Sequence, residues 1–380
     1  MSTPFRVIVL AFLATRLALF AIGTVAVERM PVNAHEEGGG LHLPRQPHAF
    51  LEAWARYDAC WYLVIAEKGY RAPVGQKTAD MRANFFPLFP ALISAVLPVV
   101  HEPMLAGLIV SNTSFLIFLV VLWQLVRIDW SASVATKTLW IYLLFPTAFF
   151  LSGAYSESVL MAITAGALLA ARRGHWGLAG VLAGAATLAR FVGVVSIVPV
   201  VIEYAVAYRS ERSASGDVRL SAADLARVLV PTAVAVTGYL VFAGRTFGNP
   251  LATFASQALF RGPIAPPWQP FIDVWSAGIS LHSYDTSIID ASLAAVAVLS
   301  LPWIYARVRF SYLCYALLIV LIPLSGSLVS FTRMLLPSFP HAILLAQFVD
   351  RRRVTTPVLV LFGALEAVAM TAFATWNWVA

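Results

Sequence analysis

A series of apolar segments, most of them long enough to cross a hydrocarbon core about 30 Å thick, constrains this chain more than any other feature. Only 12% of its 380 residues are charged and 60% are hydrophobic, and the charges gather between the apolar segments. A soluble globular chain has about a quarter of its residues charged. The composition therefore excludes a cytosolic enzyme, a disordered tail and a secreted disulfide scaffold. The apolar segments are 5–27, 84–100, 105–126, 138–153, 155–171, 176–189, 192–208, 226–247, 288–306, 310–328, 334–349 and 356–376.

Positive charges between these segments predict the topology, because Lys and Arg are enriched in cytoplasmic loops. The basic groups are Arg127 with Lys137, Arg172 with Arg173, Arg209 to Arg227, Arg307 with Arg309, and Arg351 to Arg353. Segments between successive groups must cross in pairs, which places the amino terminus inside and the carboxyl terminus outside. The same groups account for the net charge of +7, so no nucleic-acid partner is expected.

Segment 84–100 does not fit this alternation. It carries Pro87, Pro90 and Pro98 within a short apolar run, so we expect a re-entrant or surface-lying element on the outer face. The remaining segments give about eleven spans.

The expected fold is therefore all-α, a polytopic transmembrane helical bundle that forms a single integral-membrane domain over residues 1–380. Two long loops are predicted outside: 28–104, with amphipathic and re-entrant helices, and 248–287. No glycine-rich nucleotide-binding loop occurs, which excludes an ATP-driven pump with its own motor. Since functional residues concentrate on loops held by a rigid scaffold, we expect the working surface to face outward.

The densest group of polar and aromatic residues lies in the first outer loop. A helical stripe begins at Asp58 and continues through Trp61, Tyr62, Ile65 and Ala66. Spacing alone favours an aromatic anchor helix in the membrane interface, with Asp58 as its N-cap. The alternative is a carboxylate at the water–lipid boundary that acts as a general base on a sugar hydroxyl.

Four further charged residues lie near or within the predicted spans, where an unpartnered charge is costly. Glu157 is either a helix cap or a second functional acid. Arg190 and Arg333 lie on the outer side against the charge rule, where they either extend to the headgroups or coordinate phosphate. Arg16 lies mid-span, needs a buried partner, and has a structural or a substrate role.

The second outer loop offers weaker signals. Gln257 is a candidate pocket residue, and His282 with Asp285 could bind a metal, although one His-x-x-Asp is weak support. No Asp-x-Asp motif occurs, and Cys60 and Cys314 lie far apart. No cofactor is therefore expected to be required, and a divalent metal is an option without a motif behind it.

Two motifs follow each other in the first outer loop: Asp58-Ala59-x-Trp61-Tyr62-x-x-Ile65-Ala66-x-x-Gly69-Tyr70, and Phe85-Phe86-Pro87-Leu88-Phe89-Pro90. Together they resemble the PIG-V family, the integral-membrane mannosyltransferases that add the second mannose in GPI-anchor synthesis, and its bacterial relatives. Further matching runs are Phe145-Pro146-Thr147-Ala148-Phe149-Phe150-Leu151-Ser152, Tyr155-Ser156-Glu157-Ser158, Leu188-Ala189-Arg190, Gly248-Asn249-Pro250-Leu251 and Arg333-x-Leu-x-Pro-x-Phe-Pro.

The resemblance implies a GT-C glycosyltransferase of the bacterial branch, with juxtamembrane helices in the first outer loop. Its donor would be a polyprenyl-phosphate sugar, its acceptor an extracytoplasmic lipid or glycan, and its reaction inverting. An early-loop acid is the presumed base in that class, which corresponds to Asp58. The family usually has Trp before this acid, where the present chain has Tyr57.

Within this hypothesis each candidate residue has a role. Asp58 and Glu157 are the predicted catalytic acids, and Arg190 and Arg333 are predicted to bind the donor phosphate. The predicted substrate pocket contains Tyr57, Trp61, Tyr62, Arg16 and Gln257. The expected location is the cell membrane, with many spans, contact with membrane lipids and an extracytoplasmic site.

A membrane transporter or lipid flippase is the alternative, because intramembrane charges such as Arg16 also mark substrate paths. Transporters commonly repeat a helix bundle. No repeat relates the two halves of this sequence, which favours the enzyme.

Overall fold

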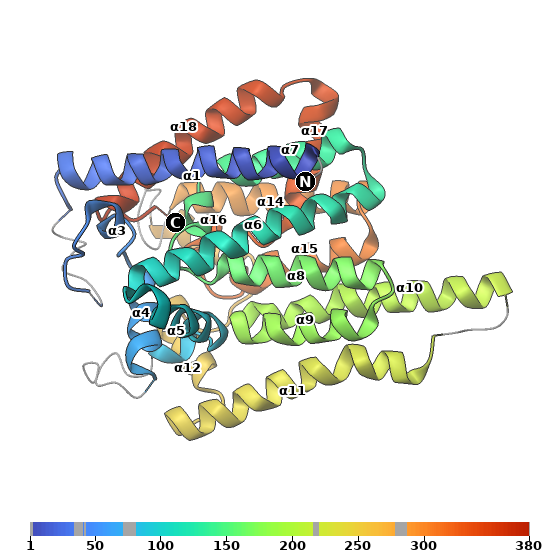
Figure 1. Cartoon of the computed structure of the whole chain (residues 1–380). Coiled ribbons are helices and arrows are strands. Elements are labelled where there is room, and N and C mark those ends of the chain that lie inside the picture. Colours follow the sequence, from blue (N-terminus) through green and yellow to red (C-terminus); the bar gives the residue numbers. More distant parts are fainter. Residues whose placement is uncertain are drawn as a thin grey trace.

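The computed structural model describes residues 3–33, 41, 43–70, 81–215, 220–277 and 287–379, and across them the regular secondary structure is helical. Long helices run side by side between two ends of the molecule (Figure 1). They are α1 (Thr3–Arg29), α6 (Pro103–Asp129), α7 (Ala132–Leu144), α8 (Glu157–Arg172), α9 (Trp176–Ala189), α10 (Ile197–Ser215), α11 (Ala222–Phe247), α14 (Ile288–Arg307), α15 (Phe310–Leu324), α17 (Phe339–Arg352) and α18 (Thr355–Ala374).

Helix length and composition confirm a multi-pass membrane protein. Within the described ranges, six segments are long and apolar enough to span: Phe5–Arg29, Pro103–Asp129, Phe191–Ser213, Ala222–Phe247, Ile288–Arg307 and Thr355–Ala374. Large apolar side chains on their outer faces are exposed, for example Leu17 at 69% and Val368 at 67%. A soluble protein rarely exposes so many, whereas a lipid-facing surface requires them.

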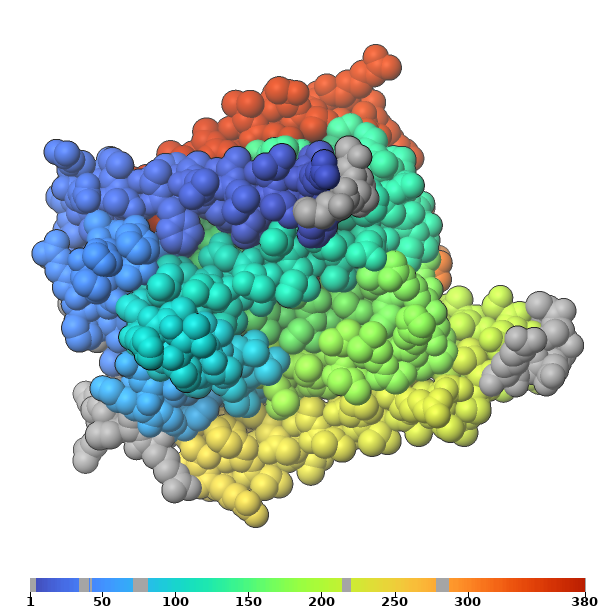
Figure 2. All heavy atoms as spheres, in the orientation of Figure 1, coloured from blue at the N-terminus to red at the C-terminus, as the bar shows by residue number. Residues whose placement is uncertain are grey.

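The two ends of the molecule differ in structure. One end carries short helices, namely α3 (Ala49–Glu52), α4 (Asp58–Lys68), α5 (Leu88–Val100), α12 (Ala252–Arg261) and α13 (Gln269–Ala277). Most of these are seen on the left of Figure 1, and the end of α10 and the start of α11 lie at the opposite end. The space-filling view shows α6, α8 and α9 packed between the flanking helices α1 and α11 (Figure 2).

Two predicted spans are wrong in their bounds because proline interrupts them. Segment 138–153 is not one helix: α7 ends at Leu144, Phe145 is extended before Pro146, and a 3₁₀ turn, η2 (Ala148–Leu151), follows. Proline disfavours helical geometry in the residue before it. Segment 334–349 likewise becomes a short α16 (Phe331–Met334), a link containing Pro337, and α17 from Phe339.

The stripe of α4 packs against protein, which corrects the expectation of an interfacial anchor helix. Trp61 is 6% exposed and stacks on Phe85, with ring centroids 5.6 Å apart. The predicted N-cap is also wrong, because Tyr57 is the N-cap residue and Asp58 is the first residue of the helix. The Asp58 carboxylate is therefore available for a contact outside α4. The predicted re-entrant segment forms α5, a helix packed against α4 and α6.

Candidate active site

A buried arginine joins the two predicted catalytic acids. Arg333, on α16, has a side chain only 3% exposed, and its Nη1 donates to Asp58 Oδ2 at 2.6 Å. Its Nε donates to Glu157 Oε1. Asp58 and Glu157 begin helices α4 and α8, so two helix starts and the turn of α16 meet at one point. A guanidinium is suited to this position because its donors form a rigid planar fork.

Glu157 is the centre of the group. Its Oε1 accepts a second hydrogen bond, from Arg190 Nη1 at 2.5 Å, and the residue is 1% exposed. Its other oxygen, Oε2, is buried and has no hydrogen-bond partner among the described residues. A buried carboxylate oxygen without a donor costs free energy. The site therefore offers one strong acceptor to a bound molecule.

Aromatic rings hold Arg333 in place from its other side. The guanidinium carbon lies 4.5 Å from the ring centroid of Tyr155 and 5.1 Å from that of Phe150. Such cation–π contacts stabilise a desolvated guanidinium. Tyr155 is fixed in turn, because its hydroxyl donates to the Arg56 carbonyl at 2.9 Å. These contacts exclude the simple alternative that Arg333 extends to the lipid headgroups.

Two adjoining cavities open at this cluster. The smaller, about 100 Å³, is lined by Asp58, Tyr62, Arg190 and Arg333 together with Gln257. The larger, about 440 Å³, shares both arginines and Gln257 but is otherwise mostly apolar. Its apolar lining comes from η3 (Phe191–Ser196), α12, the link after α12, and α15, and includes Phe191, Val192, Phe254, Ala258, Ile264 and Ile322.

Three arginines and two acids line the two cavities. Arg190, Arg261 and Arg333 face them together with the carboxylates of Asp58 and Glu157. The Arg261 guanidinium donates to backbone carbonyls, including that of Ser327 at 2.6 Å. Arg190 and Arg333 line both cavities, so the place where the cavities meet suits an anionic group.

Two of the five predicted pocket residues line the cavities. The Tyr62 hydroxyl shares a hydrogen bond with Ser156 Oγ at 2.7 Å, and burial raises the pKa of Tyr62 to about 12, so that it stays protonated. Gln257 Nε2 donates to Asn84 Oδ1 at 2.9 Å, and both residues line the two cavities.

The other three predicted pocket residues lie outside both cavities. Tyr57 packs against Phe373 and Trp376, and Trp61 packs on Phe85. Arg16 has the structural partner that its burial requires: it pairs with Glu366 at 3.4 Å and donates to the Leu143 carbonyl at 2.6 Å.

Asn84 and Arg261 are among the polar residues of the cavities that the sequence alone did not identify. Asn84 directly precedes the aromatic–proline motif, whose prolines by themselves indicate a rigid structural corner, but it faces both cavities. Arg261 is an isolated arginine in the second outer loop. Arg190 and Arg333 are likewise isolated arginines on the predicted outer side. The same departure from the charge rule could have identified Arg261.

A metal site has no support in the part of the chain that the structure describes, where no group of three His, Cys, Asp or Glu side chains is arranged to hold an ion. His282 and Asp285, the weak candidates of the second outer loop, lie outside the described residues.

The arrangement of the helices defines a fold class, the GT-C-like membrane fold. The crystal structure of ArnT from Cupriavidus metallidurans bound to undecaprenyl phosphate is similar, with a TM-score of 0.54 and 13% sequence identity. The match covers 97% of this chain and 76% of that one. At this identity the likeness concerns the fold.

A comparison with protein families agrees with the motifs of the first outer loop. A family model described as Mannosyltransferase (PIG-V) matches residues 42–219, a range that contains Asp58, Glu157 and Arg190. Searching the curated proteins gave no match. The predicted resemblance to the PIG-V mannosyltransferases is thus confirmed over residues 42–219, and the chain as a whole has a GT-C-like helical fold.

Proposed function

We propose that the protein is an inverting mannosyltransferase that moves the sugar from a polyprenyl-phosphate donor to a hydroxyl of an extracytoplasmic lipid or glycan. One observation carries the proposal: the buried Arg333 bridges Asp58 and Glu157 where a polar cavity meets an apolar one. This juxtaposition fits a substrate that has a long hydrocarbon part, an anionic junction and a sugar.

The donor fits the two cavities by chemistry. Its first isoprene units enter the apolar cavity between α12 and α15, and its sugar enters the smaller one near Asp58. The phosphodiester carries one negative charge, and Arg190 and Arg333, which line both cavities, are suited to bind it. The undecaprenyl phosphate bound to the similarly folded ArnT supports a donor of this kind.

The reaction follows from these positions. The acceptor oxygen attacks C1 of the sugar from the face opposite the phosphate, the C1–O bond breaks, and its electron pair stays on the phosphate. Asp58 takes the proton of the acceptor hydroxyl; its Oδ1 has no donor among the described residues, and its side chain is 34% exposed toward the cavity. Arg190 and Arg333 stabilise the second negative charge that develops on the leaving phosphate.

In this scheme Glu157 positions the substrate and does not take a proton from it. Its Oε1 is held by two guanidiniums, which are themselves fixed by it. Its unpartnered Oε2 accepts a hydrogen bond from a sugar or acceptor hydroxyl. A binding site for a soluble nucleotide sugar is not needed, because the lipid phosphate of the donor is itself the leaving group.

The transporter alternative loses its main support in the structure. It rested on Arg16 as a marker of a path across the membrane, and Arg16 is instead bound by Glu366 and helix carbonyls. The acids that line the cavities are the first residues of α4 and α8, and α4 lies at one end of the long helices (Figure 1).

The test uses purified full-length protein, polyprenyl-phosphate mannose and a mixture of membrane lipid acceptors. We expect release of free polyprenyl phosphate from wild type and a loss of at least about 10³-fold in Asp58→Asn, which cannot take a proton. Asp273→Asn, an exposed acid at the same end of the molecule, should keep full activity. An Asp58→Asn variant that transfers mannose at the rate of Asp273→Asn would remove Asp58 from the mechanism.

Metal removal gives a second test of the same chemistry. We propose that guanidiniums supply the charge stabilisation, so treatment with EDTA should leave the initial rate within about twofold. The rate is measured before and after chelation and again after excess Mg²⁺ or Mn²⁺. A rate lost with EDTA and restored by either ion would show that the leaving phosphate needs a metal.

A further inference from the structure

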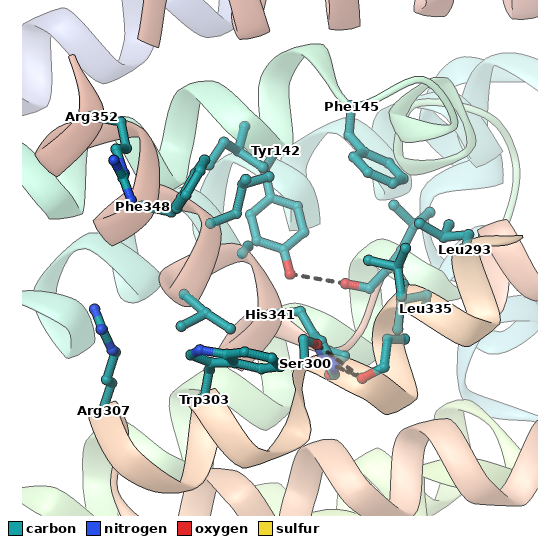
Figure 3. A pocket seen from close by; sticks show the side chains of 18 residues that line it. Tyr142, Phe145, Leu293, Ser300, Trp303, Arg307, Leu335, His341, Phe348 and Arg352 are labelled. Atoms are coloured by element: carbon teal, nitrogen blue, oxygen red, sulfur yellow. Dashed lines mark hydrogen bonds between the residues drawn. The ribbon is translucent and has the colours of Figure 1, made fainter. Parts of the chain in front are cut away.

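A third cavity, which none of the acids and arginines of the cluster line, has a different character. It is a groove of about 550 Å³ between α7, α14 and α17, and Figure 3 shows its walls. Leu293, Val296 and Trp303 line it along α14, and Leu345 and Phe348 line it along α17. Val296, Trp303 and Phe348 are more than half exposed, so the groove is open to the surrounding lipid.

The groove has polar atoms in its floor, but these are already satisfied. The Tyr142 hydroxyl donates to the Leu336 carbonyl at 2.9 Å. One ring nitrogen of His341 bonds Ser338 Oγ at 2.6 Å, and the other lies 3.1 Å from the Ala297 carbonyl. A ligand that fills this part of the groove therefore needs no polar groups.

One end of the groove is positively charged, because the guanidiniums of two arginines line it. Arg307 and Arg352 are the last residues of α14 and α17, both are exposed, and neither makes an ion pair or hydrogen bond with a described residue. In Figure 3 both lie on the left side, Arg352 above Arg307, with Phe348 and Trp303 between them and the apolar far end. The nearby acid Asp350 is occupied by Lys137.

We infer that this groove binds one anionic phospholipid, with an acyl chain in the apolar channel and the phosphate between Arg307 and Arg352. The charge pattern fits a molecule that is anionic at one end and apolar elsewhere. From Leu293 to Arg307 a helix rises about 21 Å, which accommodates a chain that fills one leaflet, about 15 Å deep.

The occupant differs from the glycosyl donor in its leaflet. Asp290, near the start of α14, accepts from the Thr332 amide beside Arg333 at 2.7 Å, so this end of α14 adjoins the acid–arginine cluster. Arg307 is at the other end of the same helix. The phospholipid headgroup therefore lies a membrane thickness away from Arg190 and Arg333, at the end where the cytoplasmic loops are predicted and where anionic lipids concentrate.

The groove also touches the segment that carries Arg333. Leu335 and Leu336 line it, two and three residues beyond Arg333, and Tyr142 holds the Leu336 carbonyl. A lipid in the groove packs against this link and restricts its motion. Bound anionic phospholipid should therefore increase the transfer rate, a consequence that rests on the proposed function, whereas lipid binding itself does not.

The binding test is native mass spectrometry of the detergent-purified full-length protein, titrated with phosphatidylglycerol or phosphatidylcholine of equal chain length. We expect wild type to retain phosphatidylglycerol on the order of tenfold more strongly, since two arginines contact its charge. Arg307→Gln/Arg352→Gln should lose this preference. Arg209→Gln/Arg212→Gln removes two exposed arginines outside the groove and should keep it.

Three results would overturn the inference. The first is an unchanged preference in Arg307→Gln/Arg352→Gln. The second is equal loss in both double variants, which would mean general surface charge. The third is displacement of phosphatidylglycerol by polyprenyl phosphate at lower concentration, or by inorganic phosphate alone, which would assign the groove to the donor lipid or to a free anion. Because the readout is bound mass, it stands whether or not mannosyl transfer is detected.

Discussion

At the scale of single residues, Arg333 organises the site. It is buried between two aromatic rings and two acids, and it is the residue that brings Asp58 and Glu157 together. A buried charge of this kind is stable only when its partners are complete. The same residue therefore supports the local structure and, in the proposed reaction, the leaving phosphate.

Arg333→Lys tests whether the forked geometry matters. Lysine keeps the charge but cannot donate to Asp58 and Glu157 from one rigid plane. We expect kcat/KM for mannosyl transfer to fall about 10²-fold or more, measured with purified protein beside Arg245→Lys, an exposed arginine of α11, as control. Activity equal to that control would show that a point charge suffices.

At the scale of elements, close helix packing sets the position of Arg190. Arg190 is the C-cap of α9, and α9 packs against α11 through glycines. A Cβ atom at Gly180 would overlap the Arg227 carbonyl oxygen, and one at Gly184 would lie 2.7 Å from that of Pro231. Small residues at such positions let helix backbones approach closely in membranes.

Gly180→Ala should therefore destabilise the protein by about 1–3 kcal/mol, because the two backbones must separate. Gly177 lies in the same helix, and a Cβ atom added there would have no other heavy atom of the described residues within 4 Å. Gly177→Ala should be neutral or slightly stabilising, since alanine favours helix. Thermal unfolding in detergent compares the two, and equal melting temperatures would contradict the packing argument.

At the scale of the whole molecule, the helices separate two different ends. One carries the acid–arginine cluster and the short helices, and the other carries the basic links between spans. The positive-inside rule predicts that the second end is cytoplasmic. The proposed function needs this orientation, because its donor sugar and acceptor are on the outer side.

Cysteine labelling of intact cells checks that orientation. Ser276 in α13 and Ser210 in α10 are both exposed, and they lie at opposite ends. Ser276→Cys should react with a membrane-impermeant maleimide in intact cells, and Ser210→Cys only after permeabilisation. Wild type is the background control, since Cys60 is buried and Cys314 half-buried. The reverse pattern would place the acids in the cytoplasm and end the proposed function.

The sequence by itself determined the membrane class, the order of the helices and the candidate charges. The length of the apolar segments and the placement of the charges reflect the free energy of transfer from water to lipid, which adds up residue by residue along the chain. This is why most predicted spans coincide with helices, and why the exceptions at Pro146 and Pro337 are local backbone effects. It also explains why Asp58, Glu157, Arg190 and Arg333 could be selected as charges in costly places.

Only the tertiary structure decided how those charges combine. That Arg333 bridges Asp58 and Glu157, whereas Arg16 pairs with Glu366, depends on contacts between segments more than 170 residues apart in each case. Among the described residues, one oxygen of Glu157 has no hydrogen-bond donor, and Arg307 and Arg352 have no ion-pair partner. These features likewise depend on the tertiary structure and not on the order of residues along the chain. Hydrogen bonding and ion pairing act over a few ångströms, so they are set by packing, which no local pattern of residues encodes.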